Sequence, residues 1–193
     1  MKSQTNLKEV ELNPNGVHDC FFHLLFLESV NYILSKKLEN KQKQSELEEM
    51  GCRIGERISN HLLNINNSRV KDIDEIIIFL GKDVWNFIFG RKISKLQTNR
   101  KGTYLIDSDD FKFLNGVFTE KHMTPETQQN IELILAIVSG VVKGTLSAFN
   151  IECIVSASFK PQPVISNLLG NMITPNTTIS SYSFTINLLN LPN

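Results

Sequence analysis

The sequence predicts an α+β fold, with helices packed on an antiparallel β-sheet of about four strands. Two observations support this class. Segments with helical spacing of apolar residues come first, and strand-like segments then lie on both sides of one further long helix. In addition, strands and helices do not alternate in the way that builds a parallel sheet. The 193 residues suit a single domain, expected at 17–193 after a flexible arm at 1–16.

The first helix is expected at 18–38, where two apolar stripes run along a helical surface. One stripe contains Cys20, Leu24, Leu27, Leu34 and Leu38, and the other contains Phe22, Phe26, Val30 and Ile33. Leu25 lies off both stripes, so the first turns are apolar almost all round. Such a helix is either buried in its own domain or docks its second face on another chain, and the residues alone leave both interpretations open.

The second and third helices follow a polar stretch at 39–44. Helix two is expected at 45–64, and its apolar stripe contains Leu47, Met50, Ile54, Ile58 and Leu62. Helix three is expected at about 71–89, where apolar residues again recur at helical steps, and Gly90 is a plausible stop signal.

The period of the apolar residues changes after Gly90 and predicts a β-hairpin. Strands are expected at 92–98 and 103–107 around a turn at 99–102, and a third strand is expected at 111–118. This hairpin carries a basic cluster made of Arg91, Lys92, Lys95, Arg100 and Lys101. The cluster is typical of a solvated rim, although it would also suit phosphates or an acidic protein.

The last part of the chain contains a long helix and two further strands. The helix is expected at 125–149, beginning at a proline, and the strands are expected at 152–159 and 182–188. The polar segment between these strands, 160–181, contains three prolines and is expected to be a disordered loop. The helix is strongly apolar, but Glu132 and Lys143 interrupt it, which favours a core helix over a membrane span.

Two pairs of glycines stand four residues apart inside helical segments, Gly51 with Gly55 and Gly140 with Gly144. A phosphate loop would place its glycines between a strand and a helix, whereas Gly51 follows a charged helical segment. Each glycine costs about 0.8 to 1 kcal/mol in a helix interior, so a compensating contact is expected. The spacing therefore indicates helices that press close against a neighbour in a soluble bundle.

The composition and the motifs give no sign of catalysis, a metal or a cofactor. Twenty basic and twenty acidic residues balance, so no overall field attracts nucleic acid. The histidines lack metal-binding spacing, and three scattered cysteines favour neither disulfides nor zinc, as expected in a reducing compartment. The polar N-terminus lacks the apolar run of a signal peptide. Assembly with other chains is thus the natural functional interpretation of the excess apolar helix surface.

Several segments together resemble one known family. In order and spacing, MGCRIGERI at 50–58, IFLGKDVW at 78–85, LQTNRKGTYL at 96–105 and the GxxxGxLSxxNI pattern at 140–151 are similar to the small subunits of the TRAPP vesicle-tethering complex, most of all to the subunit 6 type. The likeness covers about 17–159. Each motif is weak alone, whereas their ordered combination is specific.

The resemblance implies a non-catalytic scaffold that pairs through its first two helices with another small subunit, chiefly the complex's central acylated subunit. It also implies that the assembled complex acts as an exchange factor for a Rab-type GTPase between endoplasmic reticulum and Golgi, with this chain cytoplasmic and peripheral to those membranes. The partner interface expected on this basis contains Phe22, Leu25, Phe26, Val30, Gly51, Ile54, Gly55 and Ile58.

One departure from the family pattern concerns acylation. The position that matches the acylated cysteine of the central subunit is Val70, which cannot be acylated. Because related folds enclose apolar cavities, a carrier domain for a small molecule or an acyl chain remains the alternative function at this stage.

Overall fold

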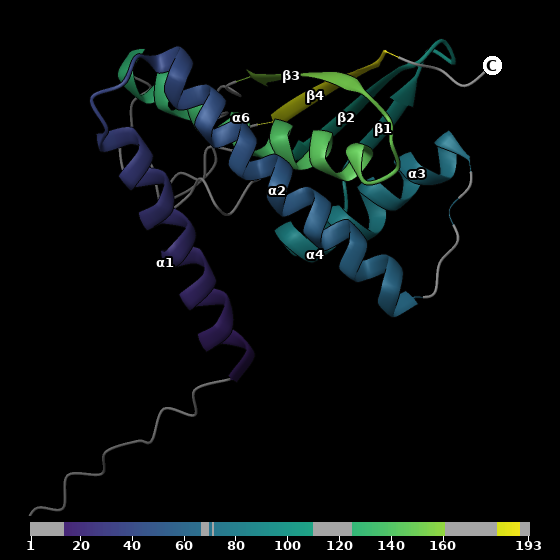
Figure 1. Cartoon of the computed structure of the whole chain (residues 1–193), viewed down its shortest axis with the longest axis horizontal. Coiled ribbons are helices and arrows are strands. Elements are labelled where there is room, and N and C mark those ends of the chain that lie inside the picture. Colours follow the sequence, from purple (N-terminus) through teal and green to yellow (C-terminus); the bar gives the residue numbers. More distant parts are fainter. Residues whose placement is uncertain (1–13, 67–69, 71, 110–124, 161–180, 190–193) are drawn as a thin grey trace, which may run out of the picture.

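The computed structural model describes residues 14–66, 70, 72–109, 125–160 and 181–189, and for 14–23, 66, 125–127 and 160 it describes the backbone alone. Within these residues the chain is α+β, as predicted, with helices and a four-stranded antiparallel sheet (Figure 1). The helices are α1 (Pro14–Ser35), α2 (Asn40–Asn66), α3 (Ile73–Phe79), α4 (Trp85–Phe89) and α6 (Pro125–Ser147). The predicted strand at 111–118, the arm at 1–13 and the loop interior at 161–180 lie outside the described residues.

Two helices begin earlier than the sequence predicted. Helix α1 starts at Pro14, so the segment 14–16 belongs to the helix and not to an arm. Proline suits this place because the first helical residue needs no intrahelical hydrogen-bond donor. Helix α2 starts at Asn40, and the amides of Gln42 and Lys43 already donate to the carbonyl of Glu39. The polar stretch expected to separate the helices is thus mostly helical, since lysine and glutamine are good helix formers.

The third predicted helix is interrupted by a π-helical turn at Leu80–Val84, between α3 and α4. Leu80, Gly81 and Val84 of this turn are buried, and Trp85 follows them into the core. The centre of the Trp85 ring lies 5.6 Å from the centre of the Phe184 ring. Helix α4 ends as predicted, because Gly90 adopts the left-handed conformation with a φ of 66° and its amide donates to Asn86.

The sheet has the strand order β1-β2-β4-β3, and every neighbouring pair is antiparallel. Its strands are β1 (Lys95–Thr98), β2 (Thr103–Asp109), β3 (Cys153–Lys160) and β4 (Ser181–Leu188). Buried and partly exposed residues alternate along β2 and β4, which confirms the expectation of one wet face for the last strand. Residues Tyr104, Ile106, Phe184 and Ile186 form the buried side of this sheet.

Helix α6 is the centre of the core. It packs on β3 on one side and along α2 on the other, and Figure 1 shows α2 beside α6 with the strands above them. A 20-residue stretch of α6, Gln128–Ser147, is apolar enough to span a membrane by composition, yet 78% of its apolar window is buried inside the protein. This burial is that of a core helix, as expected.

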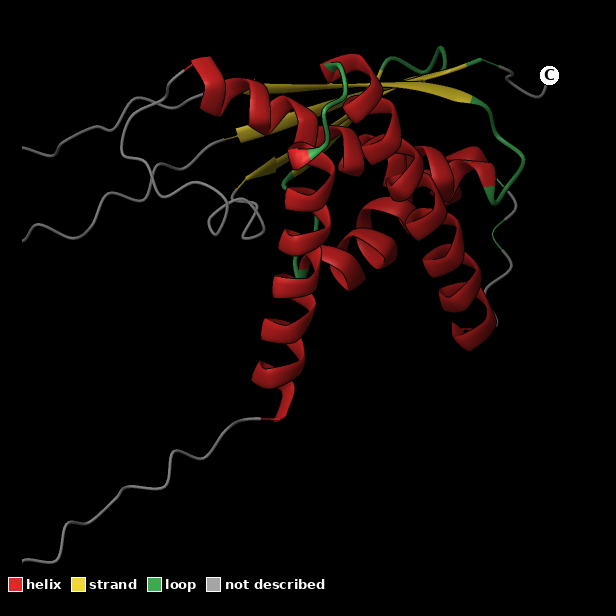
Figure 2. Cartoon of the chain, turned by 60° about the vertical axis from the view of Figure 1, so that its left-hand side comes forward, coloured by secondary structure: helices red, strands yellow, loops and turns green. Residues whose placement is uncertain are grey.

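Helix α1 is placed differently from the other helices. It meets α2 near the turn that joins them and then diverges from the rest of the molecule, as two views at 60° show (Figures 1 and 2). Among its described side chains, Val30 and Ile33 are buried in the core, and Phe26 and Leu34 pack against it. The arrangement leaves an open wedge between α1 and α2.

Candidate partner-binding surface of helices α1 and α2

The two glycine pairs meet each other within the chain. A Cβ atom added to Gly51 would lie 3.0 Å from the Cα of Gly140 and closer still to the carbonyl of Ile137, and one added to Gly140 would strike the backbone of Glu48. Added Cβ atoms on Gly55 and Gly144 would likewise collide with backbone across the contact. The backbones of α2 and α6 thus approach more closely than any side chain would permit.

This geometry confirms that the glycines serve a close helix contact and corrects the identity of the neighbour. Gly51 and Gly55 are buried against α6 of the same chain, so they have no surface to offer to a partner. The sequence could not distinguish the two cases, because the four-residue spacing is the same whether the opposite helix belongs to this chain or to another.

Polar groups flank the glycine contact. Glu48 on α2 and Lys143 on α6 form an ion pair, and both side chains are only about 30% exposed. Cys52 follows Gly51 on α2, and Cys153 begins β3, which packs on α6. Burial raises the pKa of the Cys52 thiol, and burial raises the pKa of the Cys153 thiol to about 11. Both thiols are therefore protonated at neutral pH, which does not suit a nucleophile.

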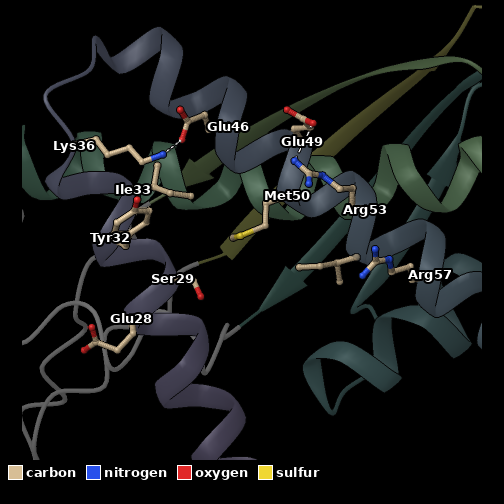
Figure 3. Close-up of a pocket in the computed structure, with 11 residues that line it drawn as sticks. Glu28, Ser29, Tyr32, Ile33, Lys36, Glu46, Glu49, Met50, Arg53 and Arg57 are labelled. Atoms are coloured by element: carbon tan, nitrogen blue, oxygen red, sulfur yellow. Dashed lines mark hydrogen bonds and ion pairs between the residues drawn. The ribbon is translucent and has the colours of Figure 1, made fainter.

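The opposite side of α2 borders an open groove of about 860 Å³ between α1 and α2. Figure 3 shows the groove in the wedge between the two helices. The lining residues come from α1, from the turn after it and from one side of α2, and they are Glu28, Ser29, Tyr32, Ile33, Lys36, Glu46, Glu49, Met50, Arg53, Ile54 and Arg57. Six of these eleven carry ionisable acidic or basic side chains.

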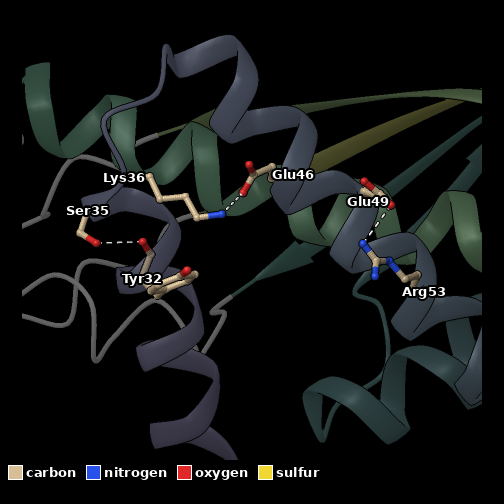
Figure 4. A network of polar contacts seen from close by, with 6 residues as sticks. All are labelled: Tyr32, Ser35, Lys36, Glu46, Glu49 and Arg53. Carbon is tan, nitrogen blue, oxygen red and sulfur yellow. Dashed lines mark hydrogen bonds and ion pairs between the residues drawn. The ribbon is translucent and has the colours of Figure 1, made fainter.

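Two ion pairs organise the upper wall of the groove (Figure 4). Lys36 donates from Nζ to Glu46 Oε2 at 2.7 Å, and the same ammonium lies 5.1 Å from the centre of the Tyr32 ring. The hydrogen bond to Glu46 raises the pKa of Lys36. Arg53 donates to Glu49 at 2.9 Å, one helical turn away on α2. These pairs place charge on the groove wall while leaving Met50 and Ile54 as its apolar floor.

The outer side of α1, which is the side turned away from the buried Val30, carries exposed apolar side chains, and one of them, Tyr32, also lines the groove. Leu24 and Leu25 are each 55% exposed, and Tyr32 is 67% exposed. Full burial of an apolar side chain of this size stabilises a protein by about 1.5 to 3 kcal/mol relative to exposure. A helix that exposes several such side chains therefore gains free energy when a partner covers them.

The predicted interface residues divide into three groups. Leu25 is exposed and Ile54 lines the groove, so both are open to a partner. Phe26 and Ile58 are half-buried and pack against the core. Val30 is fully buried, so the prediction that it contacts a partner was wrong. The same correction applies to Gly51 and Gly55. The side chain of Phe22 lies outside the described residues, although its backbone is part of α1.

Sequence reasoning missed most of the groove residues. Tyr32, Lys36 and Glu46 were not singled out, because none lies on an apolar stripe. A signal was present in the spacing of Glu49 and Arg53, since opposite charges four residues apart pair along a helix face. Such a pair shows that a face is polar, but not that a second helix borders it.

The lining of the groove is of mixed character. Six of its eleven residues carry acidic or basic side chains, while Tyr32, Ile33, Met50 and Ile54 supply apolar surface. Among the described residues no three side chains of histidine, cysteine, aspartate or glutamate gather to hold a metal ion. What the arrangement offers is a surface of mixed apolar and charged groups on two diverging helices.

Comparisons with known proteins identify the family to which the chain belongs. The family model described as transport protein particle (TRAPP) component matches residues 22–179, and the chain belongs to that family. Its relatives include subunit 6b of the trafficking protein particle complex from Danio rerio, 29% identical over 143 residues, which cover 74% of this chain and 88% of that protein. Subunit 6A from Homo sapiens is 30% identical over 124 residues, covering 64% of this chain and 75% of that protein. The resemblance to the subunit 6 type is thereby confirmed.

A solved structure supports the fold. The trafficking protein particle complex subunit 3 from Naegleria fowleri, covalently bound to palmitic acid, superposes with a TM-score of 0.65 over 92% of this chain and 98% of that one, at 14% identity. At this identity the likeness concerns the fold alone. The chain is thus a TRAPP component, and its fold is that of the subunit 3 structure.

Proposed function

We propose that this chain is a non-catalytic scaffold subunit of a TRAPP-type tethering complex, and that it pairs with another small subunit through α1 and α2. The observation that carries the proposal is the state of α1, which diverges from the body with Leu24, Leu25 and Tyr32 exposed above an open groove. A helix with apolar residues on two sides gains free energy when a second chain covers the outer side.

The partner would be the central acylated subunit, and the assembled complex would support nucleotide exchange on a Rab-type GTPase in transport between endoplasmic reticulum and Golgi. Membership of the family and similarity to subunit 6 proteins support this assignment. The chain would be cytoplasmic and peripheral to the membranes.

The test is co-expression of the full chain with a subunit 3-type protein from the same organism. We expect a stable complex of one copy of each chain, and we expect Leu25→Asp to weaken it at least about tenfold, because a charge would be buried without a partner. Leu25 is exposed, so the helical circular dichroism of the free chain should not change.

Ile78→Asp is the matched control, because Ile78 is 53% exposed, like Leu25, but lies on α3. It should leave the affinity unchanged. If Leu25→Asp and Leu24→Asp both retain full affinity while the complex forms, pairing does not use the outer side of α1 and the proposed interface is wrong.

A further inference from the structure

The segment from Val84 to Ile106, which contains β1 and the turn after it, carries an unbalanced positive charge, and the acidic residues Asp107 and Asp109 follow only at the end of β2. Five basic residues lie at 91–101, and no acidic residue occurs from Val84 to Ile106, although the whole chain has a formal net charge of zero. The hairpin lies outside α1 and α2, so the proposed pairing of those helices does not account for its charge.

Within the described part of the chain, four of these cations are available to an external ligand; Asp107, which lies opposite Lys95 in the strand register, accepts a hydrogen bond from Ser183 instead. Lys92, Lys95, Arg100 and Lys101 are all exposed, and within the described part of the chain none of them forms an ion pair. They stand at both ends of β1: Lys92 precedes the strand, Lys95 begins it, and the other two form the turn after it.

The hairpin turn holds its cations in defined positions. The side chain of Asn99 accepts hydrogen bonds from the amides of Lys101 and Thr103, at 2.8 and 3.0 Å. Arg100 adopts a left-handed φ of 56°, and the carbonyl of Gly102 accepts from Leu188 on β4 at 2.9 Å. The turn is therefore anchored to the sheet, which limits the conformational entropy that binding there would cost.

Strand β1 is an edge of the sheet with all four of its residues exposed. Just after β1, the amide of Asn99 donates a hydrogen bond to the carbonyl of Thr103 on β2. In the same register, Gln97 lies opposite Leu105. Because hydrogen-bonded pairs alternate in an antiparallel ladder, the backbone groups of Leu96 and Thr98 point away from β2. No other strand among the described residues pairs with this side.

We propose that the β1 edge is a docking site for an acidic, extended segment of a partner polypeptide, which adds a strand next to β1. Such a segment satisfies the outward amides and carbonyls of Leu96 and Thr98 and places carboxylates between the cations at the two ends of the strand. A second copy of this chain in the same role would set cations against cations, so the charge excludes self-pairing at this edge.

An anionic membrane would fit the cations but not the backbone. It would attract Lys92, Lys95, Arg100 and Lys101, yet it would leave the edge amides without protein partners. The combination of a strand edge that no described strand covers and flanking positive charge thus favours an acidic polypeptide, and a membrane becomes an outcome of the test.

The experiment uses the full-length chain and a fluorescently labelled peptide of alternating glutamate and threonine, with binding followed by anisotropy. We expect the triple variant K92E/K95E/K101E to bind at least about tenfold more weakly, and binding to fall steeply with salt. The matched control K37E/K41E/K82E has the same change of net charge at exposed lysines elsewhere, and we expect an effect of about twofold or less.

Backbone pairing is tested separately on the unaltered protein. In hydrogen–deuterium exchange, the peptide should slow the amides of Leu96 and Thr98, and a peptide with proline at alternate positions should bind much more weakly. The proposal is overturned if these amides are not protected, if the proline peptide binds equally well, or if both triple variants lose the same affinity. Binding only to phosphatidylserine vesicles, and not to the peptide, would also overturn it in favour of a membrane surface.

Discussion

Helix α2 has a neighbour on each side, and its two contacts differ in kind. Towards α6 it presents Gly51 and Gly55, and the two backbones touch. Towards α1 it presents Met50, Arg53 and Arg57, and an open groove lies between the helices. In the first contact the glycines let the two backbones meet, whereas in the second long side chains line the space between the helices.

This difference shows how one helix can join a rigid core to an adaptable surface. Close packing without voids makes the α2–α6 contact intolerant of added atoms. In the α1–α2 region, flexible charged side chains line a solvated space that a second chain can fill. The tight contact supports the fold, and the open one is available for assembly. Four variants test this division, and the largest effect is expected at the glycines.

Gly55→Leu should destabilise the chain most. The added Cβ would lie 2.2 Å from the carbonyl oxygen of Val141, so the helices must separate. We expect the free energy of unfolding to fall by about 3 kcal/mol or more, and the thermal midpoint to fall by about 6 to 12 °C. Differential scanning fluorimetry or urea unfolding measures it.

Gly90→Ala is the control for that variant, because an added Cβ at Gly90 meets nothing within 4 Å. Only its left-handed conformation is strained, at a cost of about 1 kcal/mol. If Gly55→Leu kept its stability and lost only partner binding, the glycines would serve an external contact after all.

Val30→Ala tests whether the later turns of α1 belong to the core. Val30 has no exposed surface, so removing two methyl groups should lower the free energy of unfolding by about 2 kcal/mol in urea titration. Leu25→Ala, on the exposed side of the same helix, should change it by less than about 0.5 kcal/mol. Equal effects of the two variants would show that α1 has no distinct inner and outer side.

The dependence of folding stability on alkaline pH should reveal the burial of the Cys153 thiol beside the α2–α6 contact. The pKa of Cys153 is raised from 9.0 to about 11, so on raising the pH the unfolded thiol ionises first and the folded state loses stability between these values. The full contribution is present below pH 9.0. Stability measured from about pH 8 to about pH 11 should therefore decline less steeply in Cys153→Ser than in the unaltered chain. Identical slopes would mean that the thiol is accessible to water.

The smallest effect is expected for Lys36→Met in the open region. Its ion pair with Glu46 is partly exposed, and the pair joins the end of α1 to α2 without filling a void. Salt-screened pairs of this kind contribute little. We expect an unchanged unfolding midpoint and an increase in hydrogen exchange in the last turn of α1; a large loss of stability would show that this contact is as tight as the other.

Local sequence signals located the hairpin, the helix stop at Gly90 and the strand at the end of the chain. These elements follow from residues that act on their own neighbours, such as Asn99 in the turn and the alternation along β4. The starts of α1 and α2 were misplaced because Pro14 and the polar residues at 40–44 permit either a loop or a helix. The π-helical turn at Leu80–Val84 left no signal in the period of the apolar residues.

Patterns in the sequence were enough to predict the class of fold, the four described strands, the excess apolar surface of α1 and the close helix contact at the glycines. The folded chain was needed to show that Val30 is buried while Leu24 and Leu25 are exposed, and that α6 covers the glycine side of α2. Periodicity shows which residues share a helix face, whereas the element that covers the face depends on contacts between residues distant in sequence.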